Sequence, residues 1–199
     1  MNFCSECGHA VALSIPAGDN RPRHVCTQCG TIHYQNPKMV IGSIPVWEPA
    51  LAQEGTLQVL LCRRAIEPRH GYWTLPAGFM ENGETTSEAA LRETEEEAGA
   101  HIEIGKLFSL LNVAHVHQVH MFYLARLLDL DFAPGEESLD VQLFSERDIP
   151  WDELAFPTIR TTLELFFADR VKMREGVLHT YEVHSHDIRH PMIAPREPD

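Results

Sequence analysis

The chain contains 199 residues, of which 44% are hydrophobic and 23% are charged, and its formal net charge is −13 at pH 7. This composition is that of a folded globular protein and excludes a disordered chain. The negative charge argues against DNA, RNA and anionic membranes as partners, because each of them binds through a basic surface. No apolar run approaches the roughly 20 residues that span a bilayer, and the first residues lack the pattern of a signal peptide. We therefore expect a cytoplasmic protein.

Residues 1–35 contain two pairs of closely spaced cysteines. Cys4 and Cys7 form the first pair, and Cys26 and Cys29 form the second after eighteen intervening residues. This spacing is typical of a zinc ribbon, in which four thiolates surround one structural Zn²⁺. A segment with so few aliphatic residues needs such an ion, because zinc binding supplies free energy of folding. Two disulfides or a redox pair are the alternatives, and a reducing cytoplasm disfavours the disulfides.

The rest of the chain alternates between apolar runs of strand length and polar links that contain glycine. Helices are predicted at about 86–98 and 157–170. Residues 67–80 read as a loop. Strands are predicted at 38–47, 57–64, 102–114, 119–129 and 141–144.

These patterns divide the chain into a zinc ribbon over 1–35, a central domain over 36–155, and a C-terminal helix and tail over 156–199. We expect the ribbon to support the fold or to mediate a homodimer, and contact with substrate or RNA is the alternative. The tail is rich in histidine and proline, and its sequence predicts no clear structure. Three of its histidines could line a pocket, bind stray metal or be solvated: His184, His186 and His190.

The most acidic stretch of the chain, residues 78–99, contains seven glutamates. Within it, Thr85 is predicted to be the N-cap of the helix, with Glu88 three residues later as its capping-box partner. Gly99 is predicted to end the helix, because glycine adopts the left-handed conformation that a C-terminus needs.

Three glutamates of this helix, Glu93, Glu96 and Glu97, share one face at about 100° per residue. Like charges at these spacings repel by a few tenths of a kcal/mol per pair, so a divalent cation that offsets the repulsion would explain the cluster. Carboxylate ligands suit Mg²⁺ or Mn²⁺. The alternative is an ordinary solvated acidic face. The face predicted to be buried carries Ala90, Leu91, Thr94 and Ala98.

The segment GFMENGETTSEAALRETEEEAGA resembles the Nudix box, G-x5-E-x7-R-E-U-x-E-E-x-G-U, in which U is a bulky aliphatic residue. The two U positions carry the smaller Thr94 and Ala100, which predicts a slightly different packing of the helix on its sheet. The resemblance covers about residues 37–150. Every other fixed position matches: Gly78, Glu84, Arg92, Glu93, Glu96, Glu97 and Gly99.

The Nudix resemblance implies an α/β/α sandwich around a mixed sheet, preceded here by the small zinc ribbon. It also implies hydrolysis of a nucleoside diphosphate linked to a further group X, with Mg²⁺ or Mn²⁺ as the catalytic ion. The backbone carbonyl of Ala77 matches a position that often completes the metal shell, and Arg92 would hold a glutamate in place. One glutamate of the box, or a carboxylate outside it, serves as general base in different members. The resemblance makes Glu84, Arg92, Glu93, Glu96 and Glu97 the candidate catalytic residues, the last three as metal ligands.

The ribbon and box together are similar to the ribbon-bearing Nudix enzymes of plant plastids, over about residues 3–170. That similarity implies hydrolysis of FAD, ADP-ribose or both, with release of AMP. Another ribbon-bearing Nudix group hydrolyses NADH and carries an SQPWPFPxS motif after its box, and nothing like it follows Gly99 here. An NADH or NAD pyrophosphatase remains an alternative. So does a non-catalytic nucleotide-sensing module, although a sensor has no need of three glutamates.

Residues outside the box are candidates for metal or substrate contact. Glu137 lies where the family often places an additional carboxylate. Three aromatic residues could stack on adenine or flavin, with core packing as the alternative: Trp73, Phe79 and Phe122. Three arginines could meet phosphates, or could be ordinary solvated residues: Arg63, Arg64 and Arg69.

Overall fold

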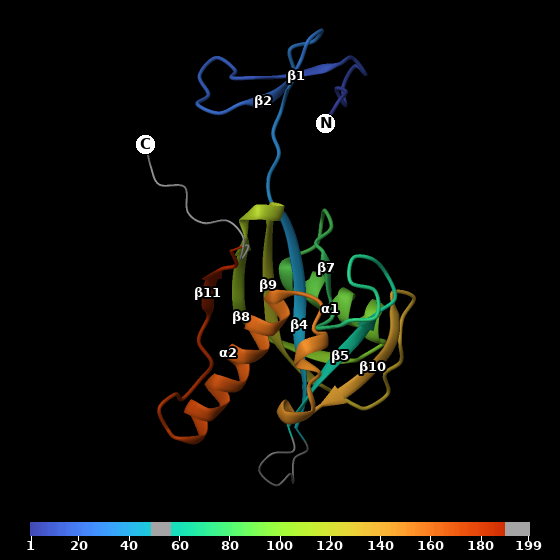
Figure 1. Cartoon of the computed structure of the whole chain (residues 1–199), viewed down its shortest axis with the longest axis vertical. Coiled ribbons are helices and arrows are strands. Elements are labelled where there is room, and N and C mark those ends of the chain that lie inside the picture. Colours follow the sequence, from blue (N-terminus) through green and yellow to red (C-terminus); the bar gives the residue numbers. More distant parts are fainter. Residues whose placement is uncertain (49–56, 190–199) are drawn as a thin grey trace. The chain divides into compact units, whose positions relative to one another are not determined.

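The computed structural model describes residues 1–48 and 57–189. The chain forms two compact units, Met1–Pro37 and Lys38–Asp199, and each is described by itself (Figure 1). In the first unit, β1 (Val11–Ser14), β2 (Arg23–Cys26) and β3 (Ile32–His33) form an antiparallel sheet in that order. The buried hydrophobic residues of this unit are Cys4 and Cys26, so cysteine contacts stand where a larger domain has an aliphatic core.

The second unit is built on an eight-stranded sheet. The order along the sheet is β10-β5-β4-β9-β8-β11, with β6 paired to β5 and β7 paired to β4. The β4–β9 and β8–β11 pairs are parallel and the others are antiparallel, so the sheet is mixed, as predicted. Its strands are β4 (Lys38–Trp47), β5 (Gln58–Arg64), β6 (Trp73–Thr74), β7 (Ala77–Phe79), β8 (Ile102–Val113), β9 (Gln118–Leu127), β10 (Ser138–Phe144) and β11 (His184–Asp187).

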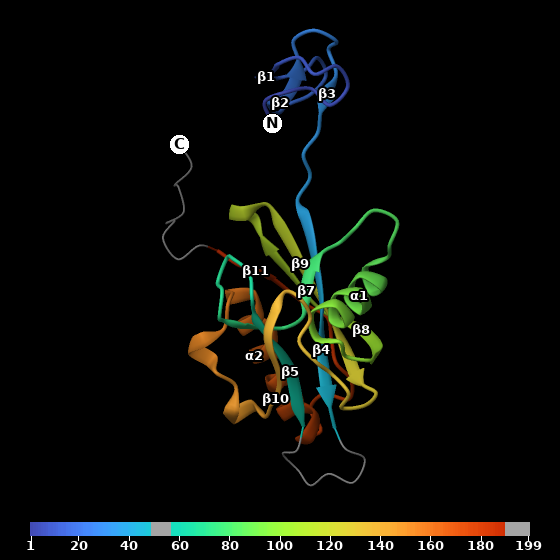
Figure 2. The same ribbon diagram turned by 90° about the vertical axis from the view of Figure 1, so that its right-hand side faces the viewer.

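Two helices, α1 (Thr86–Ala98) and α2 (Pro157–Arg174), cover opposite faces of this sheet (Figure 2). The central strand β4 contacts both layers, because side chains alternate between the two faces of a strand. Ile41 packs against Ala89 and Ala90 of α1, whereas Ile44 belongs to the cluster that includes the apolar side of α2. The predicted α/β/α sandwich is therefore confirmed. The described part of this unit also contains three short 3₁₀ helices: Ala114–Val116, Glu146–Asp148 and Trp151–Glu153.

The segment 67–80, predicted to be a loop, contains the short strands β6 and β7. Each has only two or three residues, which is too short for a periodic pattern to reveal. Both strands form only because they pair with longer ones: β6 pairs with β5, and β7 pairs with β4. Tertiary pairing therefore decides the conformation of this segment.

The tail from Glu175 onward contributes β11, which pairs in parallel with β8. His184 lies in this strand, with Nε2 at 2.7 Å from the carboxylate of Asp169 on α2 and its ring edge-on to Phe108 at 5.0 Å. His186 is exposed on the same strand, and His190 lies outside the described residues. Neither helix within the described ranges is long and apolar enough to cross a membrane.

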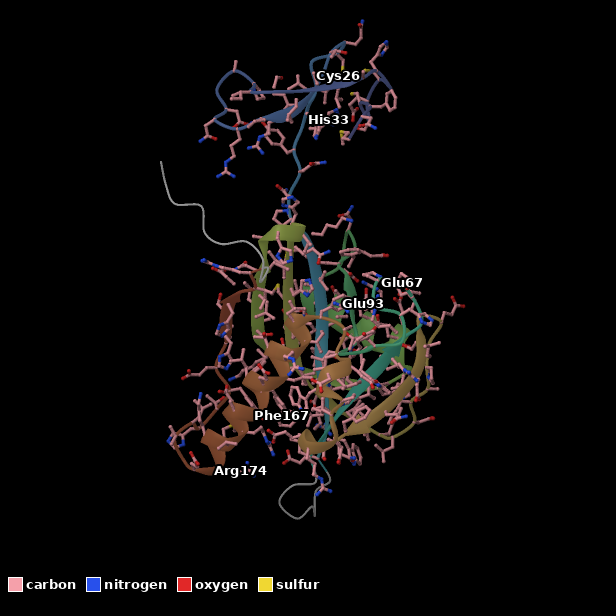
Figure 3. The ribbon with its side chains drawn as sticks, viewed as in Figure 1. Cys26, His33, Glu67, Glu93, Phe167 and Arg174 are labelled. Atoms are coloured by element: carbon pink, nitrogen blue, oxygen red, sulfur yellow. The ribbon has the colours of Figure 1, made fainter. Side chains whose placement is uncertain are left out.

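The inner side of α2, which includes Phe167 (Figure 3), is expected to contribute strongly to stability. Leu163 is fully buried in this layer, and Leu130 is 53% exposed elsewhere in the same unit. Leu163→Ala should lower the free energy of unfolding by about 2–5 kcal/mol, because it leaves a cavity in a packed core. Leu130→Ala, the matched exposed control, should change it by less than about 0.5 kcal/mol. Urea unfolding measures both, and equal effects would contradict this packing.

Candidate active site

Helix α1 has the caps that the sequence predicts. The Thr85 hydroxyl accepts a hydrogen bond from the Glu88 N–H, and the Glu88 carboxylate accepts one from the Thr85 N–H at 2.7 Å. Gly99 adopts a left-handed conformation with φ of 58° and ends the helix. The structure also explains why a threonine occupies position 94: its hydroxyl lies 2.7 Å from the Ser43 hydroxyl of β4. A polar pair thus replaces the bulky aliphatic contact of a typical Nudix box.

Arg92 is the centre of a polar network at this helix. Its pKa is raised, chiefly by the hydrogen bonds to Glu84, and the guanidinium in turn lowers the pKa of Glu84 to about 2. Glu84 therefore has a physical role that its position in the motif did not reveal: it holds Arg92. The guanidinium donates to both oxygens of Glu84 at 2.8 and 3.0 Å, to Glu93 at 2.8 Å, to Glu96 at 3.0 Å and to the Phe79 carbonyl at 3.2 Å.

Glu93 and Glu97 are buried although both are carboxylic acids. They are 8% and 7% exposed, whereas the Glu96 side chain is 59% exposed. Burial is the main reason that the pKa of each buried group is raised, to about 8 for Glu97, and repulsion from Glu137 adds to both. The helix therefore does not present its three glutamates to solvent as one face, because two of them point into the protein.

Strand β7 passes directly over these two carboxylates. The Ala77 N–H donates a hydrogen bond to Glu97 at 3.2 Å. A Cβ atom at Gly78 would overlap the carboxylate of Glu93, so the fixed glycine of the motif is needed for close approach of the backbone.

The loop before β10 also approaches α1 closely, at the C-terminal end of the helix. The Gly135 N–H donates to the Glu97 carbonyl at 3.1 Å, and a Cβ atom at Gly135 would overlap the backbone carbonyl of Glu96. This contact fixes the loop that brings Glu137 to the buried glutamates, which supports its selection as an additional carboxylate.

The chemistry of this carboxylate group fits a hard divalent cation. Buried carboxylates with raised pKa values stay ionised at neutral pH only if a positive charge is close, and oxygen ligands suit Mg²⁺ or Mn²⁺. Arg92 supplies part of that charge by holding Glu93 and Glu96. Within residues 1–48 and 57–189, only the cysteine cluster brings three or more ligand atoms within 4.8 Å of one another, so ion binding would require these glutamate side chains to converge.

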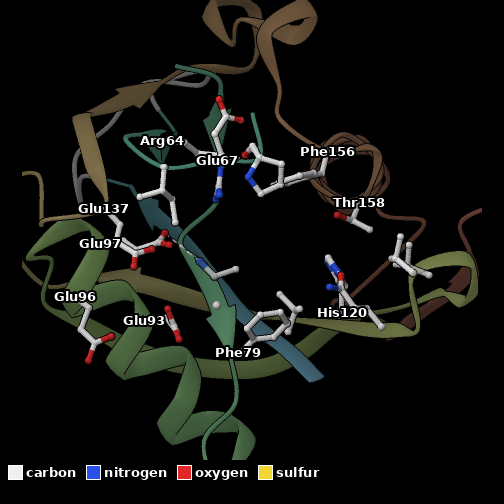
Figure 4. Close-up of a pocket in the computed structure, with 18 of the residues that line it drawn as sticks. Arg64, Glu67, Phe79, Glu93, Glu96, Glu97, His120, Glu137, Phe156 and Thr158 are labelled. Carbon is white, nitrogen blue, oxygen red and sulfur yellow. Dashed lines mark hydrogen bonds between the residues drawn. The ribbon is translucent and has the colours of Figure 1, made fainter. Parts of the chain in front are cut away.

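A pocket of about 880 Å³ opens beside the glutamates (Figure 4). Four of the predicted residues outside the catalytic set line it, namely Arg64, Phe79, Ala77 and Glu137. Arg64 is close enough for its charge to lower the pKa of Glu97 in part. These residues are therefore placed where a substrate next to the glutamates would contact them.

Four other predicted substrate contacts lie elsewhere and line no part of this pocket. Trp73 and Phe122 belong to the core, where Trp73 packs edge-on against Phe144 with ring centroids 4.9 Å apart. Arg63 donates to the carbonyl of Gly71 at 2.9 Å. The Arg69 guanidinium lies over the ring of Tyr72 at 5.3 Å. Core packing and local loop contacts thus account for these side chains.

The pocket also contains residues that the sequence reasoning did not select. Gln118 and His120 come from β9, and Phe156 and Thr158 come from the start of α2. Side chains alternate between the two faces of a strand, so the sequence of β9 could have placed His120 on the same face as Phe122. No sequence pattern predicts that this face lies next to α2. Their assembly is a consequence of the tertiary fold.

The four predicted zinc ligands of the first unit do come together. The Cys7–Cys26, Cys7–Cys29 and Cys4–Cys29 sulfur atoms lie 3.4, 3.5 and 3.7 Å apart. Four thiolates around one zinc ion have S–S distances of about 3.8 Å, from Zn–S bonds of about 2.3 Å in a tetrahedron. Backbone N–H groups also point at the sulfur atoms of Cys4 and Cys26 at 3.4 Å, and the two that donate to Cys26 lower the pKa of its thiol.

Comparisons with known proteins agree with both units. The family model described as Nudix N-terminal, a zinc ribbon, matches residues 2–35, and the NUDIX domain model matches residues 49–166. Together with the sandwich fold and the buried glutamates of α1, these matches show that the chain belongs to the Nudix family of hydrolases.

Individual relatives give a more detailed comparison. A NUDIX hydrolase of Nitrosomonas europaea, known from a crystal structure, is 48% identical, with a TM-score of 0.82 over 94% of this chain and 99% of that chain. The NAD-capped RNA hydrolase NudC of Photobacterium profundum is 32% identical over 73% of this chain and 48% of its own length. The ADP-ribose pyrophosphatase of Methanocaldococcus jannaschii is 31% identical over 54% of this chain and 68% of its own length. The chain thus spans about half the length of the NudC protein that it matches.

The raised pKa of Glu97 predicts a pH dependence of stability in the presence of a chelator. The folded state favours the protonated acid, so this group stabilises the fold fully below its usual pKa of 4.5, and that contribution is lost as the pH rises through about 8. Glu97→Gln should therefore raise the free energy of unfolding relative to the unmodified chain at pH 9, by on the order of a few kcal/mol, and by much less at pH 5. Glu95→Gln, on the exposed side of α1, is the control. If the free energy of unfolding of Glu97→Gln and that of the unmodified chain change in parallel from pH 5 to 9, the result would contradict the burial of an ionisable Glu97.

Proposed function

We propose that the protein hydrolyses the pyrophosphate bond of a nucleoside diphosphate linked to a further group, with Mg²⁺ or Mn²⁺ as the required ion. The observation that carries this proposal is the pair of buried carboxylates, Glu93 and Glu97, beside a pocket of about 880 Å³. A buried anionic pair next to an open pocket is costly to the fold, and it becomes useful when an ion and an anionic substrate share the site.

The residues divide the chemistry between them. Glu93 and Glu97 would hold the ion, together with Glu96 and the carbonyl of Ala77. When bound, Mg²⁺ or Mn²⁺ supplies positive charge that offsets the charge of the pyrophosphate and of the leaving phosphate. Glu137, which lies beside Glu97 (Figure 4), would accept the proton of the attacking water.

Two arginines have different tasks in this proposal. Arg92 is a positioning residue, since Glu84 fixes its guanidinium and the guanidinium fixes Glu93. Arg64 lines the pocket, and its guanidinium would contact the phosphates of the substrate. The site therefore attracts an anionic substrate although the chain carries a net charge of −13.

FAD, ADP-ribose or both are the proposed substrates, with AMP as one product. The name of the Methanocaldococcus jannaschii relative, ADP-ribose pyrophosphatase, supports ADP-ribose, and the sequence similarity to the plant plastid enzymes motivates FAD. The NudC relative favours a second candidate, an NAD-type substrate. Against this candidate, the sequence after Gly99 lacks the motif of the NADH-hydrolysing group.

A substrate panel tests the reaction. Purified protein is incubated with FAD, ADP-ribose or NADH, each with Mg²⁺, with Mn²⁺ or with a chelator, and AMP is measured by chromatography. We expect AMP from FAD or ADP-ribose with either ion and none with the chelator. AMP from NADH alone would favour the second candidate, and no AMP from any substrate would refute the proposed reaction.

The assignment of the glutamates is tested by substitution. Glu97→Gln should lower kcat by about 10²–10⁴-fold at unchanged secondary structure by circular dichroism, because it removes a carboxylate from the ion site. Glu95→Gln lies on the same helix and should keep its activity within about twofold. If both variants retain full activity, Glu97 has no part in catalysis.

We also propose that the four cysteines bind one structural zinc ion. The close approach of their sulfur atoms and the ribbon family match support it. Metal analysis of native protein should find one zinc per chain, and Cys29→Ser should reduce that occupancy. Native protein without zinc, with four reactive thiols, would be incompatible with this assignment.

A further inference from the structure

We propose that His120 and Thr158 form a base-recognition subsite in the pocket. The subsite would bind a planar heterocycle, with a His120 nitrogen as hydrogen-bond acceptor and the Thr158 hydroxyl as donor. The inference rests on the proposed function, because it assigns one part of the same nucleotide substrate to these residues. Figure 4 shows both side chains on the side of the pocket away from Glu93, Glu96 and Glu97. The two sides of the pocket therefore differ in chemistry, one anionic and one neutral.

The His120 ring has one partnered and one unpartnered nitrogen. The ring is 9% exposed on β9, and its Nε2 lies 2.9 Å from the side-chain oxygen of Gln118. An amide oxygen accepts hydrogen bonds, so Nε2 carries the proton and Nδ1 is left as an acceptor. Nδ1 is buried and makes no hydrogen bond within the described part of the chain. Burial lowers the pKa of this ring to about 4, which keeps it neutral at pH 7.

Thr158 contributes the complementary hydroxyl from the first turn of α2. It is 2% exposed, and its hydroxyl is likewise buried and without a hydrogen bond to any described residue. One turn further along, the buried Thr162 hydroxyl lies 3.1 Å from the Ser109 hydroxyl. The same helix therefore satisfies one buried threonine within the fold and leaves the other, next to the pocket, unsatisfied.

Two unsatisfied buried polar atoms at one pocket are costly, because most such groups in folded proteins have a partner. Among the residues that the structure describes, three buried side-chain atoms lack a partner, and two of them are Nδ1 of His120 and the Thr158 hydroxyl. Both residues line the same pocket. A ligand that supplies both missing hydrogen bonds would remove the cost, and this identifies the pair as a binding feature.

The surroundings favour a flat, neutral group over a phosphate or a sugar. Apolar residues are prominent in the lining, including Val40, Val113, Phe156 and Ile188. A neutral histidine acceptor would repel a phosphate oxygen, which also presents lone pairs. A heterocycle presents an N–H to Nδ1 and an acceptor to the hydroxyl from one edge, while its faces contact the apolar side chains. The amino-pyrimidine edge of adenine and the imide edge of a flavin both have this arrangement.

Binding of the separate halves of FAD to the 199-residue chain tests the subsite without catalysis. Titration calorimetry is carried out with AMP and with FMN, using the unmodified chain, Thr158→Val and His120→Leu. Thr162→Val is the matched control, since it removes a buried hydroxyl from the same helix outside the pocket. Thr158→Ser keeps the hydroxyl and should bind like the unmodified chain.

We expect Thr158→Val and His120→Leu each to weaken binding of one half by about 2- to 10-fold, with Thr162→Val unaffected. A loss of affinity confined to AMP assigns adenine to the subsite, and a loss of affinity confined to FMN assigns the flavin. In turnover, KM for FAD should rise by a similar factor with little change in kcat. Unchanged binding of both halves in the two variants, or no binding of either half by the unmodified chain, would overturn the subsite.

The result is separable from that of the proposed reaction. If the unmodified protein produces AMP from FAD or ADP-ribose but neither variant changes affinity or KM, the reaction stands and the subsite is wrong. If the variants weaken AMP or FMN binding but no substrate is hydrolysed, the subsite stands and the proposed reaction is wrong.

Discussion

The burial of Glu93 and Glu97 under strand β7 is the constraint on which the candidate site depends. Carboxylates leave water only at a cost in free energy, and the fold meets that cost locally with hydrogen bonds and charge. Arg92 contacts Glu93, and the Ala77 N–H contacts Glu97. Because Arg92 also binds Glu84, these contacts connect α1, strand β7 and the loop between them. Any displacement of β7 would change the separation of the two acids and with it the affinity of the site for an ion.

The pocket joins the two layers that lie on opposite faces of the sheet. Helix α1 supplies the anionic side, and β9 with the first turn of α2 supplies the neutral side. Such a division suits a substrate with a charged centre and a flat neutral end. The tail takes part in the same arrangement, because β11 extends the sheet beside β8 and Ile188, just after it, lines the pocket.

The first unit is held together by different physics. It buries little besides two cysteine side chains, so apolar packing contributes little to its stability, and the proposed bonds from sulfur to zinc would contribute most of it. The second unit depends on apolar packing against both faces of a sheet. The loss of the proposed zinc ion would therefore affect the first unit directly and leave the principal core of the second unit in place.

Local features of the chain can be predicted from the sequence. The caps of α1 depend on residues within one turn of each helix end, and the cysteine motif repeats one short spacing twice, so both are legible in the sequence and the structure agrees with them. Which glutamates are buried, and which side chains face the pocket, depends instead on contacts between elements that are far apart in the chain. Residues such as Glu137, His120 and Thr158 are distant in sequence, and strand pairing and helix packing bring them to one pocket. Trp73 and Arg64 show the same limit, since aromatic or basic character alone could not tell a core residue from one that lines the site.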